Sequence, residues 1–388
     1  MTAPETVQVM AALGDARFVG GAVRNALLGV PVVDIDIAVA MPPREAMALL
    51  DAKGIRTIET GLDHGTVTAI AGAHAFEITS LRRDVETDGR HAKVAFTDDW
   101  ALDAARRDFT INALYASAAG EIFDYATGVE DLAAGKVRFM GDARIRIAED
   151  YLRVLRLFRF HAWYGRGALD EEGLAAATQA KDKLKTLSAE RIAKELLRLL
   201  EAKSPTSVLA VMAARGILAE LLPGDLRLVR LEQLTLLDAP RDPVLRLAAL
   251  LPDDAAAATA DRLRLSNADR VRLEQALGGQ TIAAGLSPQQ VRRLLYRLGK
   301  ARFRDKLLLQ WAGAPALAQA WRAFSALADG WELPRFPLTG RDVMLAGVPE
   351  GPEVGRILAS LEDWWVEGDF AASESALRTR LRDMIGKA

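Results

Sequence analysis

The chain has 388 residues, half of them hydrophobic, and this length predicts two or more domains with a sizeable core. It contains no cysteine, which excludes a disulfide framework and a cysteine-based zinc site. The start, MTAPETVQVM, lacks the order of a signal peptide, and no apolar run is long enough to predict a membrane span. We therefore expect a soluble, cytoplasmic protein.

The formal net charge of −2 by itself disfavours a nucleic-acid-binding protein, but the charge is unevenly distributed. Residues 1–135 hold 11 basic and 20 acidic side chains, whereas residues 136–200 hold 14 and 9. Residues 201–388 hold 25 and 23. An acidic first part suits a metal-dependent catalyst, and a basic segment behind it could hold phosphates. For the basic segment alone, chance variation among helical surfaces is the better explanation.

The chain is organised around residues 18–39, FVGGAVRNALLGVPVVDIDIAV. Two glycines, Gly20 and Gly21, separate a short apolar strand from a helical turn. Glycines let backbone amides approach a phosphate closely, and a helix N-terminus favours anions. Arg24, one turn into the helix, can reach the same anion. A glycine pair alone is usually just a turn, but this combination suggests a nucleoside triphosphate site.

A second strand, predicted over residues 32–39, carries Asp34 and Asp36. Residues two apart in a strand point to the same face, so both carboxylates are expected to leave the sheet side by side. Like charges in an apolar strand repel and lose hydration, and a divalent cation removes both penalties. One or two carboxylates together with substrate phosphates are typical Mg²⁺ ligands. An Asp-x-Asp pair alone is more often part of a surface strand or turn.

Together, GGAVRNALLG and DIDIA resemble the signature of class II tRNA nucleotidyltransferases, the CCA-adding enzymes and their bacterial poly(A) polymerase relatives. The family usually has aspartate where Asn25 stands, so a charge near the phosphate site is lost. The resemblance implies an α+β, polymerase-β-like nucleotidyltransferase head followed by an all-α C-terminal part. It also implies a head over 1–135, a helical neck that selects the base over 136–202, and a tRNA-binding body and tail over 203–388.

Residues 65–70 and 75–79 predict a β-hairpin, and PPREAMALLDAKG before it predicts a helix. Glu77 leaves the second strand of this hairpin between two apolar residues. A carboxylate on a neighbouring strand can complete the metal site of a polymerase-type palm, so Glu77 is a candidate catalytic residue. An ordinary edge-strand glutamate is an equally good explanation.

Residues 82–99 are highly charged and predict a mobile, exposed loop. The Asp-Gly-Arg-His sequence at 88–91 resembles the flexible loop that the family has at this place. The resemblance favours an enzyme that adds both C and A. The scattered histidines make a poor metal set; they are His64, His74, His91 and His161.

The sequence LDAARRDFTINALYAS follows, and residues 104–116 have helical spacing. Arg107 could contact phosphate or ribose, and Asp108 could take a sugar hydroxyl or orient an arginine. Arg-Arg-Asp alone is common on surfaces. RRDFTINAL at this distance from the aspartates closely resembles the family's second motif, which also places Asn112 among the nucleotide-binding residues. Thr127 is expected to cap a helix.

From Lys136 onward the pattern is almost wholly helical. Residues 149–160, EDYLRVLRLFRF, predict one helix with Asp150 and Arg153 near one face and Arg156 and Arg159 beside it. Arginines spaced by three repel one another unless they meet anions. Acids in a first helical turn with solvated, salt-bridged arginines are the alternative explanation.

Asp150 and Arg153 suit the recognition of two bases. Cytosine and adenine both present an exocyclic amine beside a ring-nitrogen acceptor; an aspartate accepts from the amine and an arginine donates to the ring nitrogen. Uracil and guanine place a carbonyl oxygen where the amine would be, and this oxygen repels the carboxylate. The segment closely resembles the family's EDxxRxLRxxR motif, with Arg156 and Arg159 nearer the triphosphate or the primer.

A basic helix is predicted after Ser287 and Pro288. Its basic side chains are candidates for contact with the RNA backbone, with a plain solvated helix as the alternative. The RNA-binding candidates are Arg292, Arg293, Arg297 and Lys300.

The resemblance covers essentially the whole chain. It implies template-independent addition of CMP and AMP to the 3′ end of tRNA from CTP and ATP, with Mg²⁺ held by Asp34 and Asp36. Two alternatives remain open: a poly(A) polymerase of the same family, and a non-catalytic RNA-binding relative.

Overall fold

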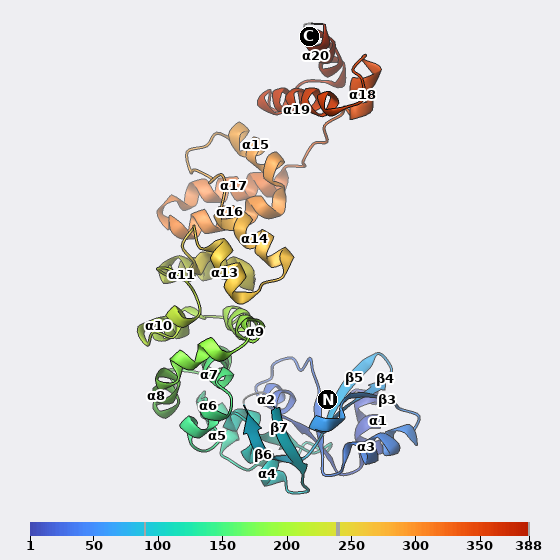
Figure 1. Ribbon diagram of the computed structural model, residues 1–388, viewed down its shortest axis with the longest axis vertical. Helices are drawn as coiled ribbons and strands as arrows, with labels where there is room; N and C mark the ends of the chain where they lie inside the picture. The colour runs from blue at the N-terminus through green and yellow to red at the C-terminus, as the bar shows by residue number, and fades with distance from the viewer. Residues whose placement is uncertain (89–90, 238–240, 387–388) are drawn as a thin grey trace. The chain divides into compact units, whose positions relative to one another are not determined.

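The structure is a computed structural model that describes residues 1–88, 91–237 and 241–386. It divides into two compact units. The first is Met1–Leu222 with Arg262–Arg264, and the second is Pro223–Asp261 with Leu265–Ala388. The first unit contains the strands and the second is helical, which confirms the predicted α+β head followed by an all-α part (Figure 1). The finer boundaries at residues 135 and 202 stay predictions.

A seven-stranded mixed sheet forms the framework of the first unit, in the order β3-β4-β5-β2-β1-β8-β9. Only β2 and β5 pair in parallel; the other neighbours are antiparallel. The predicted hairpin of β4 and β5 is confirmed. The strands are β1 Ala16–Val19, β2 Asp36–Val39, β3 Arg56–Gly61, β4 Thr66–Ala71, β5 His74–Ser80, β8 Leu114–Ala116 and β9 Ile122–Asp124.

The strand β2 begins at Asp36, four residues later than the sequence predicts. It pairs with β1, and the register Phe18↔Ile37 shows that β1 turns away into a helix where β2 begins. Residues before Asp36 therefore have no β1 backbone to pair with. Val33 is 85 % exposed, and Asp34 lies in a bend ahead of the strand rather than within it.

Residues 82–99, for which their charge predicts a mobile, exposed loop, have regular secondary structure. They contain an antiparallel two-stranded sheet, β6 Arg82–Asp88 and β7 His91–Phe96. Cross-strand pairing between residues up to 14 positions apart organises this segment despite its polarity. Residues 89–90 of the Asp-Gly-Arg-His sequence lie outside the described residues.

Residues 104–116 do not form the predicted helix. The chain ends α4 at Ala105, makes one 3₁₀ turn over Thr110–Asn112 and enters β8. Pairing of β8 between β1 and β9 is a tertiary interaction that overrides the local helical spacing. Its three residues are all buried. Thr127 precedes α5 as predicted, but the capping side chain is Asp124, which accepts from the backbone N–H of Gly128 and Val129.

Helices pack on the sheet and continue the first unit, with α1 and α3 beside β3 and β4 (Figure 1). The predicted helix after Pro42 is confirmed as α3. The helices are α1 Pro4–Leu13, α2 Gly21–Leu27, α3 Pro43–Asp51, α4 Trp100–Ala105, α5 Gly128–Ala134, α6 Ala143–Glu149, α7 Leu152–Tyr164, α8 Glu171–Gln179, α9 Ala189–Leu200 and α10 Thr206–Ala214.

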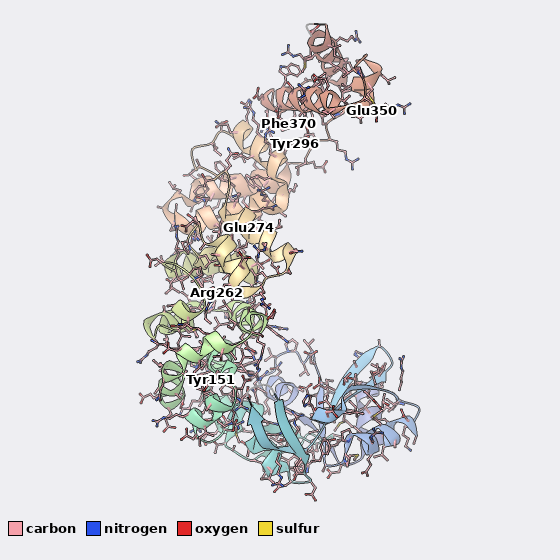
Figure 2. The ribbon with its side chains drawn as sticks, viewed as in Figure 1. Tyr151, Arg262, Glu274, Tyr296, Glu350 and Phe370 are labelled. Carbon is pink, nitrogen blue, oxygen red and sulfur yellow. The ribbon has the colours of Figure 1, made fainter. Side chains whose placement is uncertain are left out.

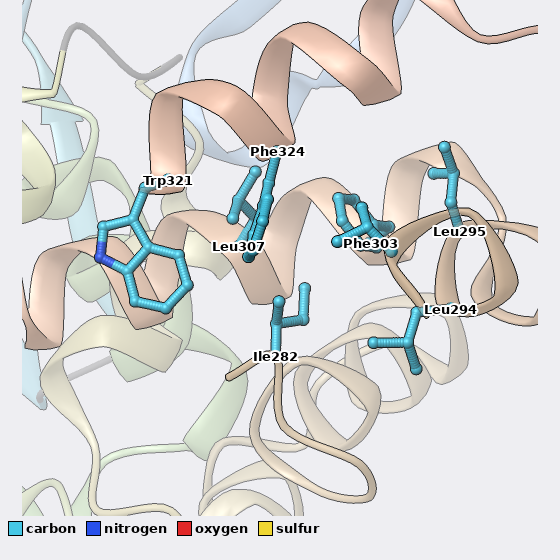
Figure 3. Close-up of a cluster of buried hydrophobic side chains, with 8 residues drawn as sticks. Ile282, Leu294, Leu295, Phe303, Leu307, Trp321 and Phe324 are labelled. Atoms are coloured by element: carbon cyan, nitrogen blue, oxygen red, sulfur yellow. The ribbon is translucent and has the colours of Figure 1, made fainter. Parts of the chain in front are cut away.

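The second unit consists of helices. Aromatic side chains of α16 and α17 form one core with Ile282, as Figure 3 shows for Phe303, Trp321 and Phe324. A second core joins α18 to α20. The helices are α11 Leu228–Leu236, α12 Pro243–Leu250, α13 Ala256–Leu263 (which crosses the division between the units), α14 Asn267–Leu277, α15 Pro288–Leu298, α16 Lys300–Gly313, α17 Ala318–Gly330, α18 Gly340–Leu345, α19 Pro352–Glu367 and α20 Glu374–Ile385.

The predicted basic helix after Ser287 is two helices, because Gly299 interrupts it with a φ of 75°. The predicted cap is confirmed: Ser287 and Gln290 form a reciprocal capping box. Within the described ranges, none of the helices is long and apolar enough to cross a bilayer.

Candidate active site

Two carboxylates lie side by side on adjacent parallel strands. Asp36 opens β2, and its Cα is paired in register with that of Glu77 in β5. Paired residues on neighbouring strands point to the same face of a sheet. Burial raises the pKa of Asp36, and the nearby charges of Glu77 and Asp34 raise it further, while Arg107 opposes them. The three acids therefore form a region of concentrated negative charge at the start of β2.

This charge fits a divalent cation. Among the residues that the structure describes, no group of three or more histidine and acidic side chains could enclose a metal by itself. Asp34 and Asp36 instead fit a site that the protein supplies only in part, with substrate phosphates completing the ligands, as is usual for Mg²⁺. The Asp36 side chain is half-buried and that of Asp34 is exposed.

Beside Asp36 lies a cavity of about 470 Å³. Its walls come from α2, the segment around the 3₁₀ turn, α7 and α9, which are far apart in the sequence. All ten residues predicted to bind the nucleotide line it, whereas Asp34 and Glu77 are not among its lining residues. The lining residues are Gly20, Gly21, Arg24, Asp36, Arg106, Arg107, Asp108, Asn112, Asp150, Leu152, Arg153, Arg156, Arg159, Phe160 and Arg191.

Gly20 allows the chain to turn from β1 into α2 at the wall of the cavity. Its φ of 65° with a ψ of −119° is a conformation that side chains with a Cβ rarely adopt. A Cβ there would lie 3.6 Å from Nη1 of Arg107. The glycine thus brings bare backbone next to a guanidinium at the cavity.

Arg24 is held by polar side chains from two other segments and by its neighbour in α2, Asn25. Its Nη1 donates to Oδ1 of Asn112, and its Nη2 donates to the Tyr164 hydroxyl at 2.8 Å. The guanidinium also lies over the Tyr164 ring, 4.0 Å from the ring centre. Asn25 accepts from Nη2 of Arg24 at 3.1 Å and donates to the carbonyl of Pro31 at 3.4 Å. Asn25 therefore replaces the family's usual charge with an amide that joins α2 to the following loop.

Arg106 and Arg107 share one buried carboxylate, Asp103 of α4. Arg106 donates to Oδ1 through Nε at 2.8 Å, and Arg107 donates to Oδ2 through Nη2 at 2.9 Å and Nε at 3.3 Å. The Tyr115 hydroxyl donates to Oδ2 at 2.6 Å. Burial alone would raise the pKa of Asp103, but Arg107, Arg106 and the Tyr115 hydrogen bond together lower it below its usual value.

Asp108 and Glu195, from outside α7, hold two of its three arginines. Arg156 donates to Oδ2 of Asp108 through Nε at 2.7 Å, and Arg159 pairs with Glu195 of α9 at 2.5 Å. Nη1 of Arg156 lies 3.6 Å from the other oxygen of Glu195. The predicted need of these arginines for anions is therefore met by the protein itself. Of the two roles predicted for Asp108, the structure shows the orientation of an arginine.

Asp150 and Arg153 have separate partners. The predicted single helix is broken here: α6 ends at Glu149, and α7 begins at Leu152, whose N–H donates to Oδ1 of Asp150 at 3.1 Å. Tyr151, labelled in Figure 2, lies in this break. The other oxygen of Asp150 accepts from Arg191 of α9 at 2.7 Å. Arg153 donates to Glu149 and, at 2.7 Å, to the carbonyl of Arg146.

Sequence reasoning missed the acids and bases that orient the predicted residues. These are Asp103, Glu149, Arg191 and Glu195. Arg191 and Glu195 occur in ERIAKEL, and the helical spacing of the apolar residues there places Glu195 on the buried face of α9. The side chain of Glu195 is 9 % exposed, and an acid at such a position signals a buried partner.

The predicted RNA-binding arginines lie in the second unit and contact its C-terminal helices. Arg292 pairs with Asp369, Arg293 donates to the carbonyl of Glu367, and Arg297 pairs with Asp363 at 2.7 Å. Next to them, Tyr296 packs on Phe370 with ring centres 5.2 Å apart, and Figure 2 labels both. Lys300 lines a separate cavity at the start of α16. Their role in RNA binding stays a prediction.

Two family models match the chain. Residues 16–138 match the poly A polymerase head domain, and residues 168–225 match a probable RNA and SrmB-binding site of polymerase A. The lining residues of the cavity from Gly20 to Asn112 fall within the matched head, and those from Asp150 to Arg191 follow it.

Similar proteins span nearly the whole chain. CCA tRNA nucleotidyltransferase 1, mitochondrial, from Danio rerio is 35 % identical over 95 % of this chain and 87 % of its own length. The CCA-adding enzyme of Levilactobacillus brevis is 31 % identical over 95 % and 94 %. A crystal structure of the Bacillus stearothermophilus CCA-adding enzyme in complex with CTP matches with a TM-score of 0.76 at 28 % identity, over 99 % of this chain and 97 % of that one. The chain thus belongs to the family of CCA-adding tRNA nucleotidyltransferases.

Proposed function

We propose that the protein adds CMP and AMP to the 3′ end of tRNA, using CTP and ATP and no nucleic-acid template. The 3′-hydroxyl of the tRNA attacks the α-phosphate of the nucleotide, a new phosphodiester bond forms, and pyrophosphate leaves. The observation that carries this proposal is one arginine-rich cavity, about 470 Å³ in volume, adjoining the carboxylates at the start of β2. Relatives that match almost end to end carry the same activity in their names.

Membership of a nucleotidyltransferase family implies the use of a divalent metal, and we propose Mg²⁺ held by Asp34 and Asp36. When bound, the metal supplies positive charge to the attacking hydroxyl and to the triphosphate. Glu77 strengthens the negative field at Asp36 from the neighbouring strand. Arg107, beside Gly20, and Arg24, beside Gly21, donate hydrogen bonds to the phosphates.

Base selection in this proposal belongs to Asp150 and Arg153. Arg191 holds one carboxylate oxygen of Asp150, and this contact fixes the side chain as an acceptor for the amine of cytosine or adenine. Glu149 and the Arg146 carbonyl hold Arg153, which donates to the ring nitrogen next to that amine. A carbonyl in place of the amine would face the Asp150 carboxylate, and this repulsion disfavours UTP and GTP.

The proposal is tested with tRNA that ends before CCA. The purified protein, Mg²⁺ and this tRNA are incubated with CTP, with ATP or with both, and product lengths are read on a gel. We expect two added nucleotides with CTP alone and three with both. Absence of incorporation from either nucleotide would refute the proposal and leave a non-catalytic RNA-binding relative.

The same gel tests a second candidate, a poly(A) polymerase. This candidate is supported by the match of residues 16–138 to the poly A polymerase head domain. Long A-tails on unrelated RNA with ATP alone would identify that activity, whereas addition that stops after CCA and requires a tRNA would exclude it.

A cytoplasmic location stays our prediction. The name of the Danio rerio relative includes the word mitochondrial, so location within the family is not uniform. Fractionation of the source cells, with the protein detected by antibody, tests this prediction.

A further inference from the structure

Asp103 is a buried acid with several hydrogen-bond partners, and it does not line the cavity. It is 1 % exposed, and donors from four residues converge on its two oxygens. The backbone N–H of Arg82 at the start of β6 donates to Oδ1 at 3.2 Å, and Arg106 joins it there. Oδ2 accepts from Arg107 and from the Tyr115 hydroxyl. A buried acid with this many partners is costly to replace.

The contact with Arg107 is the one that reaches the cavity. Nε and Nη2 of Arg107 both donate to Oδ2, and Nε also donates to the Tyr115 hydroxyl at 3.1 Å. A guanidinium is planar, so two fixed nitrogens also fix the direction of the third. That third nitrogen, Nη1, is the one beside Gly20 in the cavity wall.

From this geometry we infer that Asp103 is a positioning residue for nucleotide binding: it aims Nη1 of Arg107 at the phosphates of CTP or ATP. The inference rests on the proposed function, because that function supplies the phosphates. Asp103 touches neither substrate nor metal, and it acts through Arg107. Its loss therefore weakens nucleotide binding more than it slows the chemical step.

Asp103→Asn keeps the shape of the side chain but removes its charge and replaces one acceptor oxygen with an amide that donates. At least one of the donors from Arg106, Arg107 and Tyr115 is then left facing another donor. Arg107 keeps its own charge but loses its fixed direction. We expect the dissociation constant of CTP to rise about tenfold, the usual scale for one hydrogen bond to a charged group.

The test measures CTP binding directly, with the full-length protein, Mg²⁺ and labelled CTP in equilibrium dialysis without tRNA. A double-mutant cycle compares Asp103→Asn, Arg107→Ala and both together. If Asp103 acts through Arg107, the double variant binds CTP no more weakly than Arg107→Ala alone. With tRNA present, Asp103→Asn should show a raised KM for CTP with kcat within about threefold of wild type.

Asp131→Asn is the matched control. Asp131 is also 1 % exposed and holds Arg138 and Thr110, but it lies outside the cavity lining. We expect it to lower the melting temperature and leave the CTP dissociation constant unchanged.

An Asp103→Asn protein that binds CTP within twofold of wild type, or additive effects in the cycle, would overturn the inference. If Asp103→Asn does not fold, Tyr115→Phe keeps every charge and removes two contacts that hold Arg107 in place: the hydrogen bond from the hydroxyl to Asp103 and the one that the hydroxyl accepts from Arg107. A two- to threefold weaker CTP binding is then required. A wild-type protein that binds no CTP would overturn the proposed function as well.

Discussion

The arginines of α7 and those of α15 look alike in the sequence and differ in the structure. Arg156 of α7 pairs with Asp108, whose side chain is 10 % exposed, and it lines a cavity. Arg297 of α15 pairs with Asp363, and both side chains are about half exposed. In both helices, two of the arginines pair with acids from distant parts of the chain. The difference teaches that spacing and charge do not identify a ligand site; a buried counter-charge beside a cavity does.

The largest effect is expected for the acids at the start of β2, which lie beside the cavity and are proposed to hold the metal. Asp36→Ala removes a carboxylate proposed to hold the metal and should reduce incorporation by roughly 10³-fold, the upper range for loss of one charge-stabilising group. Asp34→Ala should behave similarly. Incorporation of α-labelled CTP into tRNA lacking CCA measures the effect, with unchanged circular dichroism showing that the fold persists.

Glu59→Ala is the control for these variants, because Glu59 is an exposed acid on β3 of the same sheet. We expect it to retain wild-type activity. Substantial residual incorporation by either aspartate variant would mean that the metal is held elsewhere.

The next largest effect is expected on the free energy of unfolding, which should depend more on Asp108 than on the less buried Asp369. Burial tends to raise the pKa of Asp108, but Arg156 and the hydrogen bond from Asn112 lower it below its usual value. A carboxyl with a lowered folded-state pKa stabilises the fold above its unfolded pKa, and this stability is lost as the pH falls through the folded value. Asp108→Asn should cost about 3 kcal/mol at pH 7, as for one half of a buried pair.

Urea unfolding between pH 7 and pH 3 measures this difference. The gap between wild type and Asp108→Asn should narrow below about pH 4, where unfolded aspartates begin to bind protons. Asp369→Asn is the less buried counterpart, with a side chain that is 22 % exposed: the hydrogen bond from Arg292 lowers the pKa of Asp369 too, but solvent screens this pair more strongly. A gap for Asp369→Asn as large as that for Asp108→Asn would contradict the comparison.

Base selection should be disturbed by a smaller amount. Asp150→Ala removes the acceptor for the exocyclic amine and the repulsion against a carbonyl, so discrimination of C and A against U and G should fall by roughly 1–3 kcal/mol. Arg153→Ala should weaken CTP and ATP together. Values of kcat/KM for the four nucleotides test both variants. If the ratio of kcat/KM for CTP and ATP to that for UTP and GTP stays unchanged in both variants, these residues only support the break between α6 and α7.

The smallest effect is expected in α15. An exposed ion pair contributes about 1 kcal/mol or less, so Arg297 can exchange Asp363 for an RNA phosphate at little cost. Arg297→Ala should reduce the slope of log affinity for tRNA against log salt by about one. Arg356→Ala, an exposed arginine of α19 paired with Glu353, is the control. If the Arg297→Ala and Arg356→Ala variants have equal salt slopes, Arg297 does not contact the RNA backbone.

The sequence predicted the elements and residues whose signals are local. The β4–β5 hairpin, α3 and the Ser287 cap follow from alternation and capping, and the ten predicted nucleotide-binding residues that line the cavity follow from three motifs. Strand β8 and the β6–β7 hairpin were missed because pairing between distant segments decides them. Asp103 and Glu195 were missed for the same reason: an acid's partner is set by the tertiary fold, and no spacing in the chain encodes it.

The cavity draws on chain segments from Gly20 to Arg191. During synthesis on the ribosome, a nascent chain that has not yet released α9 lacks Arg191 and Glu195, and so lacks the groups that hold Asp150 and Arg159. From the proposed site, we therefore expect nucleotide binding to begin only after about half of the chain has emerged. From then on, cellular CTP and ATP act as folding ligands that favour the completed first unit over its open forms.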